Sequence, residues 1–439
     1  MKAPTDIGVY QRRRARLAAA MGSGVAVIPT AAERTRNRDS HYPYRFDSYF
    51  YYLTGFREPE AVLVIVAGAG PKCILFCRDK DPEREIWDGF RFGPDAARAA
   101  FGFEEAQSIA RLDAVMPDLL ADRGTLFCHL GADAGWDARV MGWVNQVRGR
   151  ARTGVAAPSE IKDVHALLDE MRLIKGPEEL AVIRRAAGVS AAAHRRAMRA
   201  ARPGRAEYEI EAELLHEFRR QGAQAPAYPP IVAGGARACV LHYVQNDGVL
   251  QDGELLLIDA GCEIDGYASD LTRTFPVSGR FSGPQREIYE LVLAAQAAAI
   301  GAVKPGNPWD APHRAAVSVL AQGLIDLKLL TGSPEQAVET EAYKRFYMHR
   351  TGHWLGLDVH DAGDYKRGGE WRALAPDMVL TVEPGCYIRA GEGVPERFAG
   401  IGVRIEDDVL VTGAGAEVLT RDAPKSVADV EAWMKARDG

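Results

Sequence analysis

Five residues of metal-ligating type fall into two pairs with one histidine between them. The set comprises Asp259, Asp270, His353, Glu383 and Glu406. Carboxylate oxygens and imidazole nitrogens are the donors that hard and borderline divalent cations accept. The chemistry that this set could perform is therefore metal-dependent, provided that the fold brings the pairs together.

The aspartate pair lies on a predicted β-hairpin. Residues 255–261 form an apolar run that contains Asp259, and residues 268–275 are typical of a second strand after the turn signal Asp265-Gly266. The midpoint between the two aspartates falls beside this turn. Antiparallel strands would therefore place Asp259 and Asp270 roughly opposite each other, within cross-strand reach.

The glutamate pair repeats this arrangement. Residues 379–383 and 402–406 are predicted strands, and the midpoint between Glu383 and Glu406 falls in the turn-rich segment 391–395. Buried carboxylates that lie close together repel one another unless cations neutralise them. Four carboxylates and one imidazole could hold two divalent ions, with manganese, cobalt or zinc favoured over a thiolate-selected metal. A single aspartate after a strand is better explained as a turn or cap residue, but five candidates in this order weaken that explanation.

A dense histidine segment surrounds the middle ligand. Residues 349–361 contain three of the ten histidines of the chain, His349, His353 and His360. Imidazole has a pKa close to neutrality and can serve as ligand, acid or hydrogen-bond donor. Gly352 and Gly356 allow the backbone to approach closely in this segment. The pattern predicts a catalytic segment rather than isolated structural histidines.

These motifs resemble the dinuclear metallopeptidases of the pita-bread fold, and within that group most closely the Xaa-Pro aminopeptidases, also called aminopeptidase P. The resemblance extends over nearly the whole chain. The segments that carry it are 258–261, 269–274, 349–361, 381–385, 404–407 and, near the N-terminus, 39–45, 47–56 and 58–61. The N-terminal segments distinguish the chain from methionine aminopeptidases, which lack a domain of this kind.

The resemblance implies a role for each matching residue. Asp259 would bind one ion, Asp270 and Glu406 would bridge both, and His353 and Glu383 would complete the second ion. A hydroxide bridging the ions would attack the first peptide bond before proline, and Glu383 would also carry a proton towards the leaving nitrogen.

Further residues around the metal shell also match the family. The resemblance implies that His242 and His360 donate hydrogen bonds to the substrate carbonyl, and that His349 lines the proline pocket. Arg404 shares a strand face with Glu406, and Tyr387 follows Glu383 at even spacing, so both would orient carboxylates. By itself, His242 would be taken for a structural histidine.

Two domains are expected from 439 residues, because one core rarely supports a chain of this length. Residues 1–172 mix strands with alanine-rich helices and predict a non-catalytic α/β domain, to which the resemblance assigns substrate access and oligomerisation. Gly176 and Pro177 punctuate the chain and mark the start of a second domain. The resemblance implies that this domain, residues 173–439, has the α+β pita-bread catalytic fold. In the resembling enzymes oligomer neighbours lend residues to the active site, so the resemblance makes Asp39 and Trp87 candidates to reach one, and whether they do stays open.

Composition restricts partners and location. The formal net charge of −6 argues against general binding to nucleic acid or an anionic membrane. Six scattered cysteines do not form a disulfide framework and indicate a reducing cytoplasm. The basic start at residues 12–16 imitates a signal peptide, but its apolar run breaks at Gly22, which predicts an amphipathic helix that leads into a strand.

Three functions compete on this sequence. The first is a metal-dependent Xaa-Pro aminopeptidase that acts on peptides with proline in second position, as a homodimer or homotetramer, with two divalent ions, manganese before cobalt or zinc. The second is a related hydrolase, either a prolidase restricted to dipeptides or a metal-free creatinase-like enzyme, and the complete ligand set disfavours the latter. The third is a non-catalytic pita-bread binding protein. The physiological metal, the subunit count and the residue before proline remain open.

Overall fold

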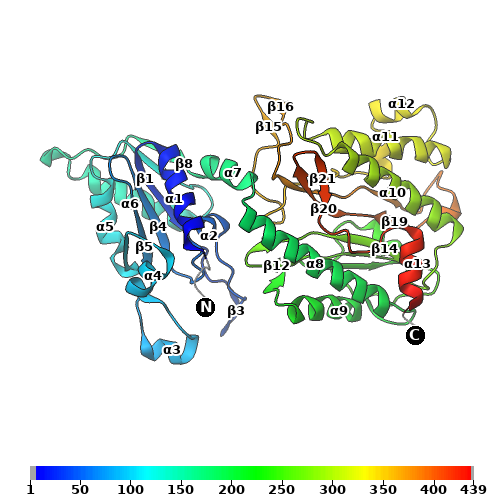
Figure 1. Ribbon diagram of the computed structural model, residues 1–439, viewed down its shortest axis with the longest axis horizontal. Coiled ribbons are helices and arrows are strands. Elements are labelled where there is room, and N and C mark those ends of the chain that lie inside the picture. The colour runs from blue at the N-terminus through cyan, green and yellow to red at the C-terminus, as the bar shows by residue number, and fades with distance from the viewer. Residues whose placement is uncertain (1–5, 437–439) are drawn as a thin grey trace. The chain divides into compact units, whose positions relative to one another are not determined.

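The structure is a computed structural model that describes residues 6–436, and contacts within the chain divide it into two units, Met1–Met171 and Arg172–Gly439 (Figure 1). Each unit has its own sheets and its own buried apolar core, so each is described separately. Across residues 6–436, none of the helices combines the length and apolarity that crossing a bilayer requires.

A six-stranded mixed sheet forms the centre of the N-terminal unit. Its strand order is β6-β5-β4-β1-β7-β8. The strands are β1 (Gly24–Pro29), β4 (Val62–Ala67), β5 (Lys72–Cys77), β6 (Glu105–Ser108), β7 (Thr125–Cys128) and β8 (Glu160–Asp163). β1, β7 and β8 run parallel to one another, whereas β4 is antiparallel to both β1 and β5. The carboxyl ends of β7 and β8 therefore meet at one edge of the sheet.

Helices and a short hairpin complete this unit. They are α1 (Ile7–Met21), α2 (Ser48–Thr54), α3 (Pro82–Asp88), α4 (Gly93–Phe101), α5 (Leu112–Leu120), α6 (Ala134–Arg148), the start of α7 (His165–Leu173), and the hairpin of β2 (Thr35–Asn37) with β3 (Ser40–His41). Alternate strand residues such as Val25, Val64 and Phe76 pack with Trp143 of α6 in the core. The predicted helix that leads into a strand near the N-terminus is confirmed by α1 and β1.

Two groups of helices cover two different apolar clusters in the second unit. The helices are α8 (Pro177–Ala200), α9 (Glu207–Arg220), α10 (Gly283–Ala302), α11 (Ala311–Asp326), α12 (Pro334–Glu339) and α13 (Val427–Lys435). Along β11 (Leu255–Asp259), Leu256 and Ile258 pack with residues of α8, α9 and α13, whereas Leu255 and Leu257 pack with residues of α10 and α11. The strand is therefore buried on both faces, which explains its continuous apolar sequence.

Short antiparallel sheets carry the rest of this unit. Their strands are β9 (Ala225–Pro226), β10 (Ile231–Gly234), β12 (Cys262–Ile264), β13 (Tyr267–Ala268), β14 (Thr272–Pro276), β15 (Lys366–Arg367), β16 (Glu370–Trp371), β17 (Val379–Val382), β18 (Gly385–Ile388), β19 (Ile401–Arg404), β20 (Asp407–Thr412) and β21 (Gly415–Val418). α8 begins at the predicted boundary because Pro177 occupies its first turn and the Glu179 side chain accepts the Gly176 N–H at 2.9 Å.

The register of the aspartate hairpin differs from the prediction by two residues. The turn lies at Asp265 and Gly266 as predicted, and both residues have positive φ angles of 51° and 83°. The strands pair Asp259 with Thr272, so Asp259 and Asp270 are diagonal neighbours rather than opposite each other. A shift of two residues keeps both side chains on the same face of the hairpin.

The glutamate hairpin has the predicted register but different strand partners. β18 pairs with β19 through Gly385 and Arg404, and β17 pairs with β20 through Val382 and Asp407. The prediction that residues 379–383 pair directly with residues 402–406 in one ladder is therefore wrong, because two separate ladders are present. Glu383 lies between the two ladders, at the position whose register partner is Glu406.

Candidate metal centre

The five predicted ligands converge in the second unit from five separate segments. The imidazole Nε2 of His353 lies 3.3 Å from a carboxylate oxygen of Asp270 and 3.7 Å from one of Glu383. Donor atoms of Asp270, His353 and Glu406 all lie within 4.8 Å of one another. The hydroxyl of Tyr228 donates to Asp259 at 2.6 Å and to Asp270, which brings the fifth carboxylate into the group.

Backbone pairing places His353 beside Glu383. The N–H of Glu383 donates to the carbonyl of Thr351 at 2.8 Å, and the N–H of Thr381 donates to the carbonyl of His353 at 2.9 Å. A Cβ at Gly352 would overlap the Thr381 carbonyl oxygen, so the close approach of the two segments requires glycine there. The ring Nδ1 of His353 lies 2.9 Å from the carbonyl of the next residue, an interaction that leaves Nε2 directed into the site.

The buried carboxylates in this centre raise one another's proton affinity. Burial raises the pKa of Glu383 to about 7, with Asp270 adding to the effect and His353 opposing it. Burial and the nearby charge of Asp270 raise the pKa of Glu406 well above its usual range. Burial lowers the pKa of His353, but the hydrogen bond to Asp270 and the charges of Asp270 and Glu383 together outweigh this and raise the value to about 9. Divalent cations would remove this repulsion, so the donor set fits metal ions.

Arg404 organises one side of the centre. Its guanidinium donates to Asp259 at 2.5 Å, to the hydroxyl of Tyr387 at 3.0 Å and to that of Thr272 at 3.1 Å. The Tyr387 hydroxyl in turn lies 2.8 Å from Nε2 of His349. Arg404 therefore contacts a carboxylate directly, whereas Tyr387 contacts Arg404 and His349.

Four residues that the sequence analysis missed also hold the ligands. The hydroxyl of Thr272 donates to Glu406 at 2.6 Å, and the buried carboxylate of Asp408 accepts the backbone N–H of Asp270 at 3.1 and 3.2 Å. Arg273 donates to the Glu406 carbonyl at 2.5 Å and pairs with Asp407 at 2.7 Å. The remaining residue is Tyr228, which precedes β10 and lies far in sequence from the aspartates that it bridges. Of these four residues, only Thr272 could have been suspected from the sequence, because it follows Asp270 by two residues.

The other predicted histidines surround the cleft. The ring of His360 lies 4.2 Å from that of His353, at 62° to it, and burial and the His353 charge lower the pKa of His360. Burial and the nearby Arg404 lower the pKa of His349 to about 3, so its ring is neutral at pH 7. His242 lines the same cleft.

A buried ion cluster anchors the loop that bears His360. The next residue, Asp361, has a side chain that is 1% exposed and accepts from Lys175 at 2.7 Å and from Arg172 at 2.5 Å. Arg172 also donates to Asp358 at 2.7 Å. Because Asp361 accepts charged donors on both carboxylate oxygens, the loop has a fixed anchor directly beside His360.

A cleft of about 840 Å³ opens onto the centre. The five candidate ligands line it together with Arg404, His242, His349 and His360, and apolar walls come from Ile231, Leu241, Val244 and Val359. Its volume lies within the range of small-molecule and peptide sites. The arrangement can bind a peptide whose first carbonyl faces the carboxylates and the histidines.

Comparisons with known proteins agree with both units. Residues 181–413 match metallopeptidase family M24, and residues 10–127 match the N-terminal domain of aminopeptidase P. The chain is 45% identical over 427 residues to an Xaa-Pro aminopeptidase of Haemophilus influenzae, with 97% of this chain and 96% of that protein covered. It is 43% identical over 430 residues to the Xaa-Pro aminopeptidase of Escherichia coli, with 97% of each covered.

Solved structures give the same result. Aminopeptidase PepP of Pseudomonas aeruginosa superposes with a TM-score of 0.97 at 51% identity, covering 100% of this chain and 99% of that one. Aminopeptidase P of Escherichia coli with the inhibitor Pro-Leu has a TM-score of 0.96 at 42% identity, covering 99% and 100%. These matches confirm the predicted fold class of an α/β N-terminal domain followed by an α+β pita-bread catalytic domain.

Proposed function

The chain belongs to metallopeptidase family M24, among its Xaa-Pro aminopeptidases, and from this premise we propose that it hydrolyses the bond between an N-terminal residue and a following proline. The observation that carries the proposal is the convergence of four carboxylates and one imidazole on a cleft that is wide enough for a peptide. The competing function of a non-catalytic binding protein does not explain why a complete donor set is kept at the base of this cleft.

Two divalent ions would be held by the five converging side chains. Asp259 would bind one ion, Asp270 and Glu406 would bridge both, and His353 and Glu383 would complete the second. When bound, the ions supply an activated water and polarise the carbonyl of the first peptide bond. The preference for oxygen donors supports manganese, with cobalt and zinc as alternatives.

Side chains of the protein would then transfer a proton and stabilise charge on the substrate. Glu383 faces the cleft and is placed to accept a proton and pass it to the leaving nitrogen. That nitrogen belongs to proline and carries no hydrogen in the substrate, so its protonation is required for departure. His242 and His360 would donate hydrogen bonds to the carbonyl oxygen as negative charge develops there.

His349 and Arg404 would act together at the proline side of the cleft. Since His349 is neutral at pH 7 and contacts the Tyr387 hydroxyl at 2.8 Å, its ring can line an apolar pocket without adding charge. Arg404 would hold the Asp259 carboxylate in its ligating orientation through the 2.5 Å contact.

Prolidase activity on dipeptides alone is the second candidate function. The metal chemistry is the same for an Xaa-Pro aminopeptidase and a prolidase, so it does not distinguish them. The cleft volume of about 840 Å³ lies high in the range for bound ligands, which favours longer peptides.

We also propose a homo-oligomeric assembly and a cytoplasmic location, which exposed residues of the N-terminal unit and the buried cysteines support. Trp87 on α3 is 83% exposed and Asp39 is also exposed, which supports their proposed contribution to an active site in a homodimer or homotetramer. All six cysteines are buried and none forms a disulfide, which supports a cytoplasmic location.

A peptide series with metal-stripped protein tests the proposal. We expect manganese to restore release of the residue before proline from Gly-Pro, from Arg-Pro-Pro and from longer peptides, while Arg-Ala-Pro stays intact. Asp270→Asn should abolish this activity, and the control Asp252→Asn, at an exposed position, should retain it. Activity on dipeptides alone would replace the proposal with a prolidase, and inactivity with every metal would refute both enzymes.

A further inference from the structure

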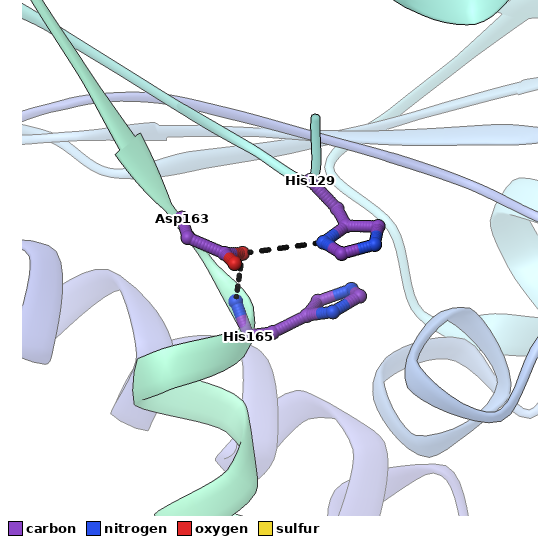
Figure 2. A group of neighbouring side chains, drawn as sticks. All are labelled: His129, Asp163 and His165. Atoms are coloured by element: carbon purple, nitrogen blue, oxygen red, sulfur yellow. Dashed lines mark hydrogen bonds and ion pairs between the residues drawn. The ribbon is translucent and has the colours of Figure 1, made fainter. Parts of the chain in front are cut away.

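Three potential metal ligands meet at the carboxyl edge of the N-terminal sheet, in the unit that lacks the proposed active site (Figure 2). β7 and β8 are parallel neighbours, and Cys128 at the end of β7 is paired with Asp163 at the end of β8. His129 follows β7 directly, and His165 is the first residue of α7. The topology of the sheet therefore brings two imidazoles and one carboxylate to the same place.

The donor atoms in this cluster lie close together, and the sign of a vacant donor comes from His129 alone. Nδ1 of His129 lies 3.5 Å from Oδ1 of Asp163, and donor atoms of all three residues lie within 4.8 Å of one another. Among the described residues, this Nδ1 has no hydrogen-bond partner and its own surface is buried. Asp163 also accepts the backbone N–H of His165 at 2.9 Å. That contact accounts for Asp163 as a turn residue before α7, but it does not account for two imidazoles.

A stack of three rings positions the imidazoles. The ring of His165 lies between those of Tyr49 and His129, at centroid distances of 3.8 and 3.9 Å and interplanar angles of 13° and 15°. The Tyr49 hydroxyl donates to Asp169 at 2.6 Å and fixes the far end of the stack. The stack therefore holds both imidazoles side by side within reach of the Asp163 carboxylate.

Space for water ligands lies next to the cluster. A cavity of about 540 Å³ is lined by His129 and His165 together with Asp133 and Trp136. The side chains of His129 and Asp163 are 37% and 54% exposed, so an ion can enter from solvent. Two imidazoles and a carboxylate form a donor set that zinc accepts, with the remaining position left to water.

We propose that His129, Asp163 and His165 form a separate zinc-binding site in the N-terminal domain. Zinc–nitrogen bonds of about 2.1 Å require donors roughly 3.4 Å apart, and the lone pairs of two stacked rings run parallel, so binding requires at least one imidazole to rotate out of the stack about its side-chain torsions. Bound zinc would tie the ends of β7 and β8 to the first residue of α7. The open coordination position makes the site exchangeable rather than permanently occupied.

Zinc stoichiometry of the full-length protein tests this site. The protein is dialysed against a zinc buffer, and zinc per chain is counted by mass spectrometry for the unaltered protein, His129→Gln, His165→Gln and the control His41→Gln, an exposed histidine of the same unit. We expect the first two variants to hold one zinc fewer than the control, with unchanged aminopeptidase activity. Equal zinc content in all four proteins would overturn the proposal.

The substitution Asp163→Asn distinguishes a role of Asp163 in zinc binding from a role in folding. An asparagine oxygen can still accept the His165 N–H and preserve the turn, but it lacks the carboxylate charge. We expect zinc affinity at this site to fall at least tenfold while the thermal midpoint without zinc stays unchanged. Unaltered affinity would contradict a role for Asp163 as a ligand.

Discussion

Replacing His194 with glutamine should change the pH dependence of stability. His194 lies on α8, is fully buried, and its Nε2 contacts the carbonyl of Ala260 at 2.9 Å. Burial, supported by the charge of Arg273, lowers the pKa of His194 from 6.5 to about 3. The unfolded chain therefore binds a proton below pH 6.5 that the folded protein excludes, so stability is complete above pH 6.5 and is lost as the pH falls towards 3.

The magnitude follows from these two values. Between pH 7.5 and pH 5.5, protonation of His194 in the unfolded chain alone should cost the folded protein about 1.4 kcal/mol. Glutamine does not titrate and can still donate to the Ala260 carbonyl. At pH 7.5, His194→Gln should be less stable by about 1 kcal/mol, because the replacement packs imperfectly. At pH 5.5 this deficit should vanish or change sign.

Guanidinium unfolding of metal-free protein at both pH values measures the difference. His216→Gln is the matched control, because His216 is an exposed histidine on α9. The difference in stability between His194→Gln and the unaltered protein should change between the two pH values. A change of less than about 0.4 kcal/mol, which is the additivity error of such comparisons, would show that burial does not lower the pKa of His194 as described.

Two further substitutions test the supports of the proposed active site. Lys175→Met leaves the buried Asp361 carboxylate with one cation fewer, which should cost about 3–5 kcal/mol of stability in thermal unfolding and should lower kcat more than it raises KM, because His360 adjoins Asp361. Gly352→Ala forces a Cβ into the Thr381 carbonyl, so the protein should lose bound manganese in equilibrium dialysis and lose activity in parallel.

Each of these two substitutions has a matched control in the same protein. Lys344→Met removes only an exposed ion pair with Glu341 and should change stability by less than about 1 kcal/mol. A Cβ at Gly188 of α8 meets no atom within 4 Å, so Gly188→Ala should keep full metal content. If either active-site variant behaved like its control, the corresponding support would have no part in holding the site.

The candidate ligands could be predicted because each depends on local chemistry. An apolar strand followed by a carboxylate is visible in a short window, and the turn at Asp265 and Gly266 could be placed by residue type alone. The register of the hairpin was wrong by two residues because it was taken from the spacing of Asp259 and Asp270 rather than from the turn. Both registers place the two aspartates on one face of the hairpin, so the error does not change which face carries them.

The supporting residues could not be predicted because their contacts are long-range. Tyr228 is 31 residues from Asp259, and Asp408 is 138 residues from the Asp270 N–H that it contacts. Buried tyrosines and aspartates also occur for purely structural reasons, so nothing in their local sequence marks them. The two strand ladders on either side of Glu383 were missed for a related reason, since the break occurs at Pro384, which cannot donate to a ladder.

The burial of every cysteine makes the protein suitable for site-specific labelling. Burial raises the pKa of each thiol, to about 11 for Cys73, Cys239 and Cys262, so few thiolates exist at neutral pH. A maleimide dye should therefore react with an introduced surface cysteine and leave the native ones unmodified. The exposed position Asp252→Cys would therefore carry a single dye on the second unit.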